Sequence, residues 1–171
     1  MHLVATRRTL MKTDILIKTG VDFADYEAVF HHLADRFIAE GFAKASYREA
    51  IFAREKDFPT GIALEYHAVA IPHSDAEHAL KSAIYFIRPN KPVKFNRPDE
   101  DSQVDAELII ALVVTDPQDQ LVVLHKLFGK LQDNAFVEQL LMAEESALSV
   151  KRHFAVSGKN RCSDVVNATR H

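Results

Sequence analysis

Apolar residues recur at helical spacing in two stretches of the N-terminal half of this 171-residue chain. Over 26–40 they fall three or four positions apart, with Asp25 placed to cap the first turn and Gly41 placed to end the helix. A second helix is predicted to begin at Ser46, which opens a Ser-Tyr-Arg-Glu capping box, and to reach Lys56 before a Phe-Pro pair. The sequence therefore predicts two helices here, the first amphipathic and the second opened by a capping box.

The C-terminal half contains a third long helical pattern and two shorter ones. Leucines and a phenylalanine repeat at helical spacing over 117–131, with Asp116 ahead of the helix as a cap and proline in its first turn. Shorter helical patterns cover 135–142 and 147–154. These helices are expected to close the domain.

Short apolar and β-branched runs between the helices predict strands at 68–71, 82–87, 93–95 and 107–114. The last run is continuously apolar, which is typical of a central strand covered on both faces. The fold class predicted is α/β: a single domain with a mixed β-sheet flanked by helices on both faces. This domain is expected to span residues 13–155, with loosely ordered tails at 1–12 and 156–171.

Composition is that of a globular domain, with 47% hydrophobic and 26% charged residues and a net charge of -3. Lys and Arg are scattered among Asp and Glu, so nucleic acid is not an expected partner. No apolar run approaches the roughly 20 residues of a membrane helix, so direct membrane insertion is not expected either. The one cysteine, Cys162, can form no internal disulfide, which fits a cytoplasmic location.

The chain presents a candidate nucleophile at the end of a predicted strand. Val69 to Ile71 is short and apolar, Pro72 cannot donate a ladder hydrogen bond, and His73 follows at once. Neutral imidazole can attack with one ring nitrogen while a hydrogen bond to the other fixes the tautomer. His73 could therefore accept a phosphoryl group. The alternative is a histidine that merely ends a strand at the surface.

Five short sequence fragments resemble those of a known protein family, which the spacing of apolar residues alone does not identify. The chain resembles enzyme IIA of the bacterial sugar phosphotransferase system, of the mannitol/fructose family and most like its galactitol type. The resemblance covers about residues 14–155 and rests on Ala53-Arg54-Glu55, Phe58-Pro59-Thr60-Gly61-Ile62, Ala70-Ile71-Pro72-His73, Ser82-Ala83-Ile84-Tyr85 and Leu127-Phe128-Gly129-Lys130-Leu131.

The resemblance implies the mannitol/fructose-type IIA fold and a phosphoryl relay without a dissociable cofactor. It implies that His73 accepts a phosphoryl group from the phosphohistidine carrier protein and passes it to a cysteine of a cognate IIB, which phosphorylates galactitol or a related polyol or sugar as IIC imports it. Arg54 matches the family's arginine beside the active histidine. A guanidinium suits that role because it offers several donors and a permanent charge to phosphoryl oxygens.

Three further residues fit the family pattern less closely. Mannitol-type and nitrogen-type members carry a second histidine where this chain has Gln120, whose amide could still bond the phosphoryl group or the imidazole. His125 lies five residues further along the helix and points elsewhere by about 140°. His67 lies six residues before His73, so in an extended segment both side chains could face the same side, and His67 could orient or shield the site.

Two other functions compete with the relay. A regulatory protein could use the same phosphohistidine as a signal, because a phosphoryl group adds negative charge and changes which partners dock. Alternatively, His67, His73 and His78 could hold a metal ion, although their spacings match no short zinc motif and no cysteine lies nearby.

Overall fold

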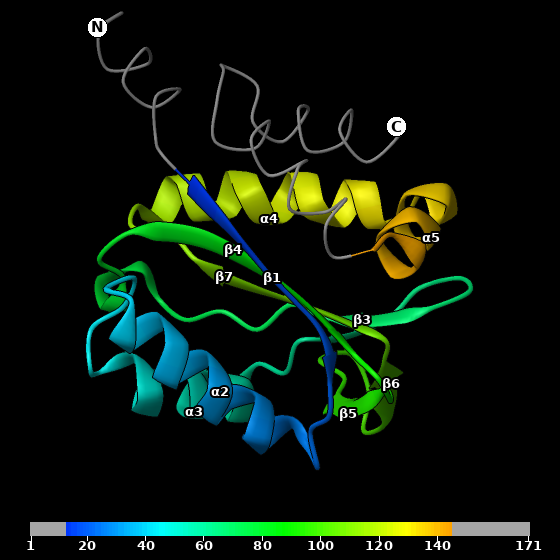
Figure 1. Cartoon of the computed structure of the whole chain (residues 1–171), viewed down its shortest axis with the longest axis horizontal. Helices are drawn as coiled ribbons and strands as arrows, with labels where there is room; N and C mark the ends of the chain where they lie inside the picture. Colours follow the sequence, from blue (N-terminus) through cyan, green and yellow to red (C-terminus); the bar gives the residue numbers. More distant parts are fainter. Residues whose placement is uncertain (1–12, 145–171) are drawn as a thin grey trace, which may run out of the picture.

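A computed structural model describes residues 13–144, which form an α/β fold with helices on both faces of a mixed sheet (Figure 1). The predicted fold class is confirmed. In chain order the elements are β1 (Thr13–Val21), α2 (Tyr26–Ala39), α3 (Tyr47–Asp57), β2 (Gly61–Ala63), β3 (Ala68–Ala70), a 3₁₀ turn η1 (Ala76–His78), β4 (Ser82–Pro89), β5 (Val93–Asn96), β6 (Gln103–Ala106), β7 (Leu108–Val113), α4 (Pro117–Leu131) and α5 (Asn134–Met142).

Five strands of the described residues make the main sheet, in the order β1-β4-β7-β3-β2. β1 runs parallel to β4 and β3 runs parallel to β7, whereas the β4–β7 and β2–β3 pairs are antiparallel. Every residue of the central strand β7 is buried. A strand covered on both faces needs no polar face, which explains why its sequence is continuously apolar.

Each face of the sheet has its own hydrophobic core. Side chains alternate along β7, so that Ile109, Ala111 and Val113 join the core beneath α2 and α3. The intervening residues of β7 join a second core beneath α4 and α5, together with Val69 and Ile71. The two helix pairs lie on opposite sides of the sheet in Figure 1. The chain around β3 is therefore fixed from both sides.

β5 and β6 form a separate antiparallel hairpin that packs against the start of β2. Gly61 is where the two approach most closely: a Cβ placed there would lie 2.6 Å from the backbone oxygen of Asn96 and 2.9 Å from Cγ2 of Val104. Only glycine permits this approach without displacing the backbone of the hairpin. Gly61 of the Phe58-Pro59-Thr60-Gly61-Ile62 fragment thus has a packing explanation.

Within residues 13–144, the predicted helix boundaries are confirmed to within one residue, with one exception in capping. Asp25 accepts a hydrogen bond from the backbone of Ala28 at 2.8 Å, and Gly41 follows α2 with a φ of +77°. Asp116 caps α4 through two backbone N–H groups. The capping box at Ser46 was a wrong prediction, because its hydroxyl forms no cap and instead meets Nδ1 of His78 at 2.8 Å.

The four predicted strands are present, but three others carried no clear sequence signal. The missed strands are β1, β2 and β6. The predicted helix at 147–154, Cys162 and both predicted tails lie outside the described residues. Among residues 13–144, no helix is both long and apolar enough to cross a membrane.

Candidate functional site

The end of β3 brings His73 to the edge of the buried sheet. Regular pairing of β3 stops at Ala70, but the carbonyl of Pro72 still accepts a hydrogen bond from the backbone N–H of Leu112 at 3.1 Å. His73 then forms an isolated parallel bridge with the same leucine. The proline thus limits pairing to its acceptor side, as its missing N–H requires. The result is a fixed backbone beneath a half-buried imidazole.

Two neighbours define the protonation state of the His73 ring. Its Nδ1 lies 2.8 Å from the carbonyl oxygen of Ile71, and its Nε2 lies 3.4 Å from Nη2 of Arg54. A carbonyl can only accept, so Nδ1–H donates to it, and a guanidinium can only donate, so Nε2 offers its lone pair. The neutral Nδ1–H tautomer satisfies both contacts. In this tautomer Nε2 is the ring nitrogen that keeps a lone pair in the plane of the ring.

Arg54 reaches the ring from the last turn of α3 and is itself held from two sides. Its Nη1 lies 3.1 Å from Oδ1 of Asp75, and its guanidinium carbon lies 5.2 Å from the centre of the exposed Phe58 ring. Its Nε is buried without a hydrogen-bond partner among the described residues. The guanidinium is thus fixed beside Nε2 by an ion pair and a ring contact rather than extended into solvent.

The electrostatic surroundings keep His73 neutral. Burial is the largest influence and lowers the pKa of its imidazole below the ordinary value, and the positive charge of Arg54 lowers that pKa further. The Ile71 hydrogen bond and the Asp75 carboxylate act in the opposite direction but do not reverse the shift. Near neutral pH the imidazole of His73 is therefore uncharged, and an uncharged imidazole has a lone pair with which it can act as a nucleophile.

A buried carboxylate lies next to Arg54 in the chain. Glu55 is 2% exposed, and its two oxygens accept the backbone N–H of Thr60 at 2.9 Å and the Thr60 hydroxyl at 2.8 Å. Burial raises the pKa of Glu55 to about 7, although the two Thr60 hydrogen bonds and the charge of Arg54 lower it in part. This carboxylate joins the end of α3 to the start of β2.

Gln120 lies at the site but makes a different contact from the one expected. It is 8% exposed in the first turn of α4, and its amide nitrogen donates to the carbonyl of Ser74 at 2.8 Å. The contact holds the residue that follows His73. A direct hydrogen bond from Gln120 to a phosphoryl group stays a prediction.

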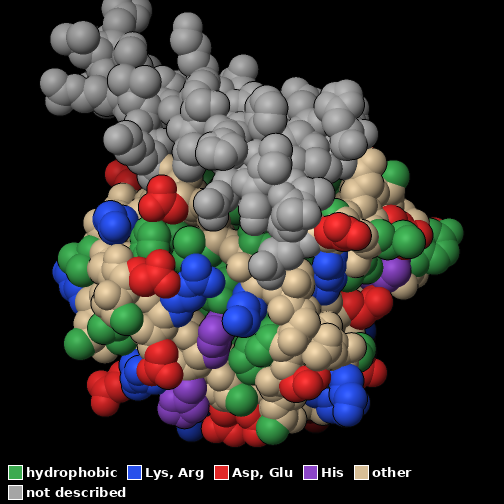
Figure 2. All heavy atoms as spheres, in the orientation of Figure 1, with side chains coloured by type: hydrophobic (Ala, Val, Ile, Leu, Met, Phe, Trp, Pro, Cys, Tyr) green, Lys and Arg blue, Asp and Glu red, His purple; other side chains and the backbone are tan. Residues whose placement is uncertain are grey.

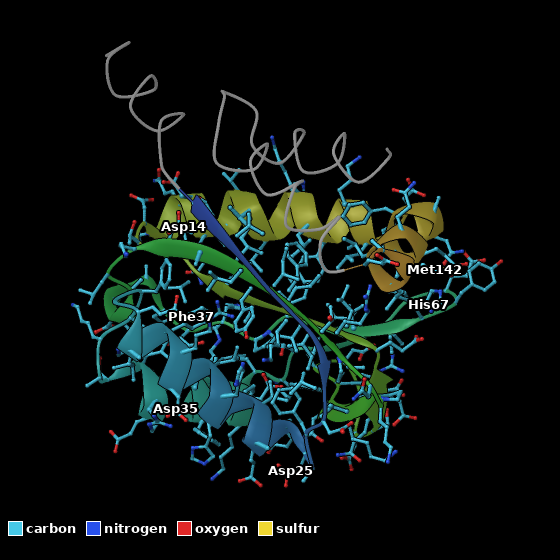
Figure 3. All side chains as sticks on the ribbon, viewed as in Figure 1. Asp14, Asp25, Asp35, Phe37, His67 and Met142 are labelled. Atoms are coloured by element: carbon cyan, nitrogen blue, oxygen red, sulfur yellow. The ribbon has the colours of Figure 1, made fainter. Side chains whose placement is uncertain are left out.

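The structure does not bring His67 beside His73. His67 lies in the turn between β2 and β3, where Nδ1 is 2.9 Å from Glu107 and Nε2 is 3.3 Å from Glu138 of α5. The contact with Glu138 places His67 against α5, and Figure 3 labels it on the side of the molecule where α5 lies. Six residues of extended chain separate it from His73, a span of up to about 20 Å.

The three histidines considered as metal ligands are also held apart. His67 lies between two glutamates, His73 contacts Arg54, and His78 bonds to Ser46. In the part of the chain that the structure describes, no three His, Cys, Asp or Glu side chains are arranged to hold a metal ion. His125 is exposed on α4.

Sequence reasoning missed three contributors to the site: Glu55, Thr60 and Asp75. Glu55 stands in an Arg-Glu-Lys-Asp run that is typical of a solvated helix face, and Asp75 follows the motif without a regular spacing. The only available signal was that Glu55 and Thr60 both belong to fragments that carried the family resemblance. Their contact across the α3–β2 connection needed the structure.

The assembled groups suit the acceptance of a small anionic group. Nε2 supplies a lone pair, and Arg54 places a fixed positive charge beside it. Phe58 and Leu121 are large apolar side chains, 63% and 68% exposed, that follow Arg54 and Gln120 in the chain. On the face drawn in Figure 2, acidic and basic side chains are interspersed among apolar ones.

Comparisons with known proteins find a family, and individual proteins, that this chain is similar to. Residues 11–149 match the family described as "Phosphoenolpyruvate-dependent sugar phosphotransferase system, EIIA 2". The galactitol-specific EIIA component of the sugar phosphotransferase system of Escherichia coli (strain K12) is 44% identical over 136 residues, covering 80% of this chain and 91% of that protein.

Two solved structures share the fold at lower identity. The nitrogen regulatory protein IIA-Ntr from Neisseria meningitidis has a TM-score of 0.64 and 24% identity, covering 98% of this chain and 99% of that chain. Mannitol enzyme IIA of Escherichia coli, solved in complex with phosphorylated mannitol enzyme IIB, has a TM-score of 0.60 and 23% identity, covering 78% and 92%. These likenesses concern the fold.

Proposed function

Because the chain belongs to the EIIA 2 family of the phosphoenolpyruvate-dependent sugar phosphotransferase system, we propose that His73 carries its phosphoryl group on Nε2. EIIA components are phosphotransferases that act through a phosphohistidine, so the chain is a phosphotransferase component of sugar transport. The observation that carries the assignment to His73 is its pair of ring contacts: Nδ1 lies 2.8 Å from the Ile71 carbonyl oxygen, and Nε2 lies 3.4 Å from Nη2 of Arg54, which together favour the Nδ1–H tautomer.

The proposed relay consists of two balanced substitutions at phosphorus. In the first, the Nε2 lone pair forms a bond to phosphorus while the bond from phosphorus to the donor's imidazole nitrogen breaks, and the donor keeps that electron pair. In the second, a partner thiolate forms the S–P bond as the Nε2–P bond breaks. Arg54 stabilises the charge on the equatorial oxygens in both steps, which are governed by positioning and electrostatics.

The partners proposed are the phosphohistidine carrier protein as donor and a cognate IIB as acceptor, with the membrane component IIC beyond it. Galactitol is the proposed transported polyol, because the galactitol-specific relatives share 44% identity over 91% of their length. The mannitol IIA of similar fold was solved with phosphorylated IIB, which supports a IIB as the class of acceptor here. The relay is proposed to operate in the cytoplasm.

Exposed apolar side chains near the nucleophile support transient docking. Phe58 lies against the Arg54 guanidinium, and Leu121 follows Gln120, whose side chain holds Ser74. A carrier that must bind, exchange and release suits a modest interface that combines a few apolar anchors with polar contacts. These two residues are proposed as part of the docking surface around His73.

The test is incubation with phosphoenolpyruvate, enzyme I and the phosphohistidine carrier protein, followed by mass spectrometry under neutral to alkaline conditions. We expect one added phosphoryl group on His73 of the wild-type chain. The His73→Gln variant should acquire none and should retain the wild-type circular dichroism spectrum. An acid-labile phosphoryl group on the folded His73→Gln protein would refute the assignment.

A regulatory role for the same phosphohistidine was the alternative expectation. The regulatory IIA-Ntr shares the fold at 24% identity, whereas the transport relatives share 44%, so sequence similarity favours the relay. Transfer from phosphorylated protein to a cognate galactitol IIB would support the relay. Stable phosphoprotein that no IIB can discharge would support the regulatory function instead.

A further inference from the structure

The buried carboxylate of Glu55 begins a chain of contacts that ends at the nucleophile. Its two oxygens accept both donors of Thr60, the backbone N–H and the hydroxyl. Thr60 is 8% exposed, so water has little access to either hydrogen bond. The carboxylate therefore fixes Thr60, the last residue of the α3–β2 connection, relative to the last turn of α3.

From Thr60 the contacts continue through the backbone to His73. The Thr60 carbonyl accepts the N–H of the fully buried Ile71 at 3.2 Å, and the Ile71 carbonyl accepts Nδ1–H of His73 at 2.8 Å. Nε2 of that ring then faces Nη2 of Arg54, the residue bonded covalently to Glu55. The five residues form a closed circuit in which the nucleophile and its cation are the two ends that meet.

We propose that Glu55 is a positioning residue for phosphoryl transfer, which through Thr60 and Ile71 holds Arg54 at its working distance from His73 Nε2. The inference rests on the proposed function, since it concerns the geometry of the same reaction. Glu55 touches neither the nucleophile nor the transferred group. It acts by fixing the end of α3 against the segment that orients the imidazole.

The surroundings of Glu55 indicate that it acts through its hydrogen bonds to Thr60 rather than through its negative charge. Burying a carboxylate costs free energy unless it is satisfied, and an apolar residue would fill the position at lower cost. Arg54 on the same helix and Tyr26 at the start of α2 are the ionisable groups that interact electrostatically with Glu55. Both Thr60 donors can also be matched by an amide, which accepts the N–H and donates to the hydroxyl oxygen.

Two matched pairs of variants test the proposal. Thr60→Val removes the hydroxyl while keeping the shape, and Thr60→Ser keeps the hydroxyl. Glu55→Ala removes both acceptors, and Glu55→Gln preserves two hydrogen bonds without charge. The measurements are the single-turnover rate of phosphoryl acceptance at saturating carrier protein and the NMR titration of the His73 imidazole in the unphosphorylated full-length chain.

We expect Thr60→Val and Glu55→Ala to slow acceptance by about tenfold to a hundredfold, because small misplacements of reacting groups are costly. In both variants the His73 pKa should rise, since Arg54 lowers it in the wild type. Thr60→Ser and Glu55→Gln should retain near-wild-type rates and titrations. A merely structural brace would lower stability without moving the His73 titration.

The proposal is overturned if folded Thr60→Val matches Thr60→Ser in both rate and titration. It is equally overturned if Glu55→Gln is as impaired as Glu55→Ala, because charge rather than hydrogen-bond geometry would then be required. If Glu55→Ala does not fold, the threonine pair still decides. Absence of phosphate on wild-type His73 would instead refute the proposed function, and the NMR titrations would still report on the circuit.

Discussion

Removing the Arg54 guanidinium tests how much its positive charge contributes to phosphoryl acceptance by His73. Arg54 contacts His73 Nε2 at 3.4 Å and Asp75 at 3.1 Å, and its side chain is 33% exposed. In Arg54→Ala, the imidazole of His73 keeps its backbone position and its hydrogen bond to the Ile71 carbonyl. We therefore expect slow phosphorylation rather than none.

The size of the effect follows from the interaction that is lost. A hydrogen bond to a charged group is worth about 1.5–3 kcal/mol, and the partly exposed position of Arg54 favours the lower end of that range. With about 1.4 kcal/mol for each tenfold change in rate, acceptance should slow by about tenfold to a hundredfold. A second consequence has a definite sign: because Arg54 lowers the pKa of His73, its removal should raise that pKa. The acid limb of the rate profile should then move to higher pH.

Rapid-quench measurement of phosphoryl acceptance across pH, with the carrier protein saturating, would test both expectations. Arg54→Lys is the matched control, since it keeps the charge but lacks the fork that reaches Asp75 and His73 together. We expect it to fall between the wild type and Arg54→Ala. An unchanged saturating rate and an unchanged acid limb in Arg54→Ala would refute this account of the arginine.

Three further perturbations separate the site from the scaffold. Gly61→Ala should lower the free energy of unfolding by about 1–3 kcal/mol, because the new Cβ meets a backbone oxygen that cannot move freely; urea denaturation measures this, and wild-type stability would contradict the close approach. Glu55 has a folded pKa of about 7 against an ordinary 4.5, so its ionisation destabilises the fold as pH rises through that window. Glu55→Gln should accordingly gain up to about 3 kcal/mol relative to wild type between pH 4.5 and pH 8, and a constant difference would count against the shift. His67→Ala should leave acceptance at the wild-type rate and cost less than about 1 kcal/mol of stability, since its polar contacts are with two exposed glutamates; a large loss of rate would place His67 in the site.

Elements with a strong period or an end signal were predictable from the sequence. α2 and α4 combine amphipathic spacing with aspartate caps, and the apolar run of β7 has one plausible location in a layered fold. β1 gave no such signal, because its apolar core of three residues is followed by lysine, threonine and glycine. β2 and β6 are only three and four residues long, and tertiary pairing rather than propensity forms them.

The candidate site was predictable only where chemistry is local. Pro72 and His73 adjoin in sequence, so a nucleophile at a strand end could be inferred from residue types alone. Arg54 is nineteen residues away, and only the family resemblance placed it beside the ring. The Glu55–Thr60 contact and the role of Asp75 depend on how α3 meets β2 and on the turn after His73, which no periodicity encodes.

The β5–β6 hairpin connects a distant part of the fold to the contacts around His73. Its backbone leaves no room for a Cβ at Gly61, the residue directly after Thr60. We therefore expect a shift of the hairpin to displace Thr60, although the hairpin contributes neither the imidazole nor the guanidinium. If Glu55 and Thr60 position Arg54 as proposed, substitutions in residues 93–106 should change the rate of phosphoryl acceptance while His73 and Arg54 stay the same.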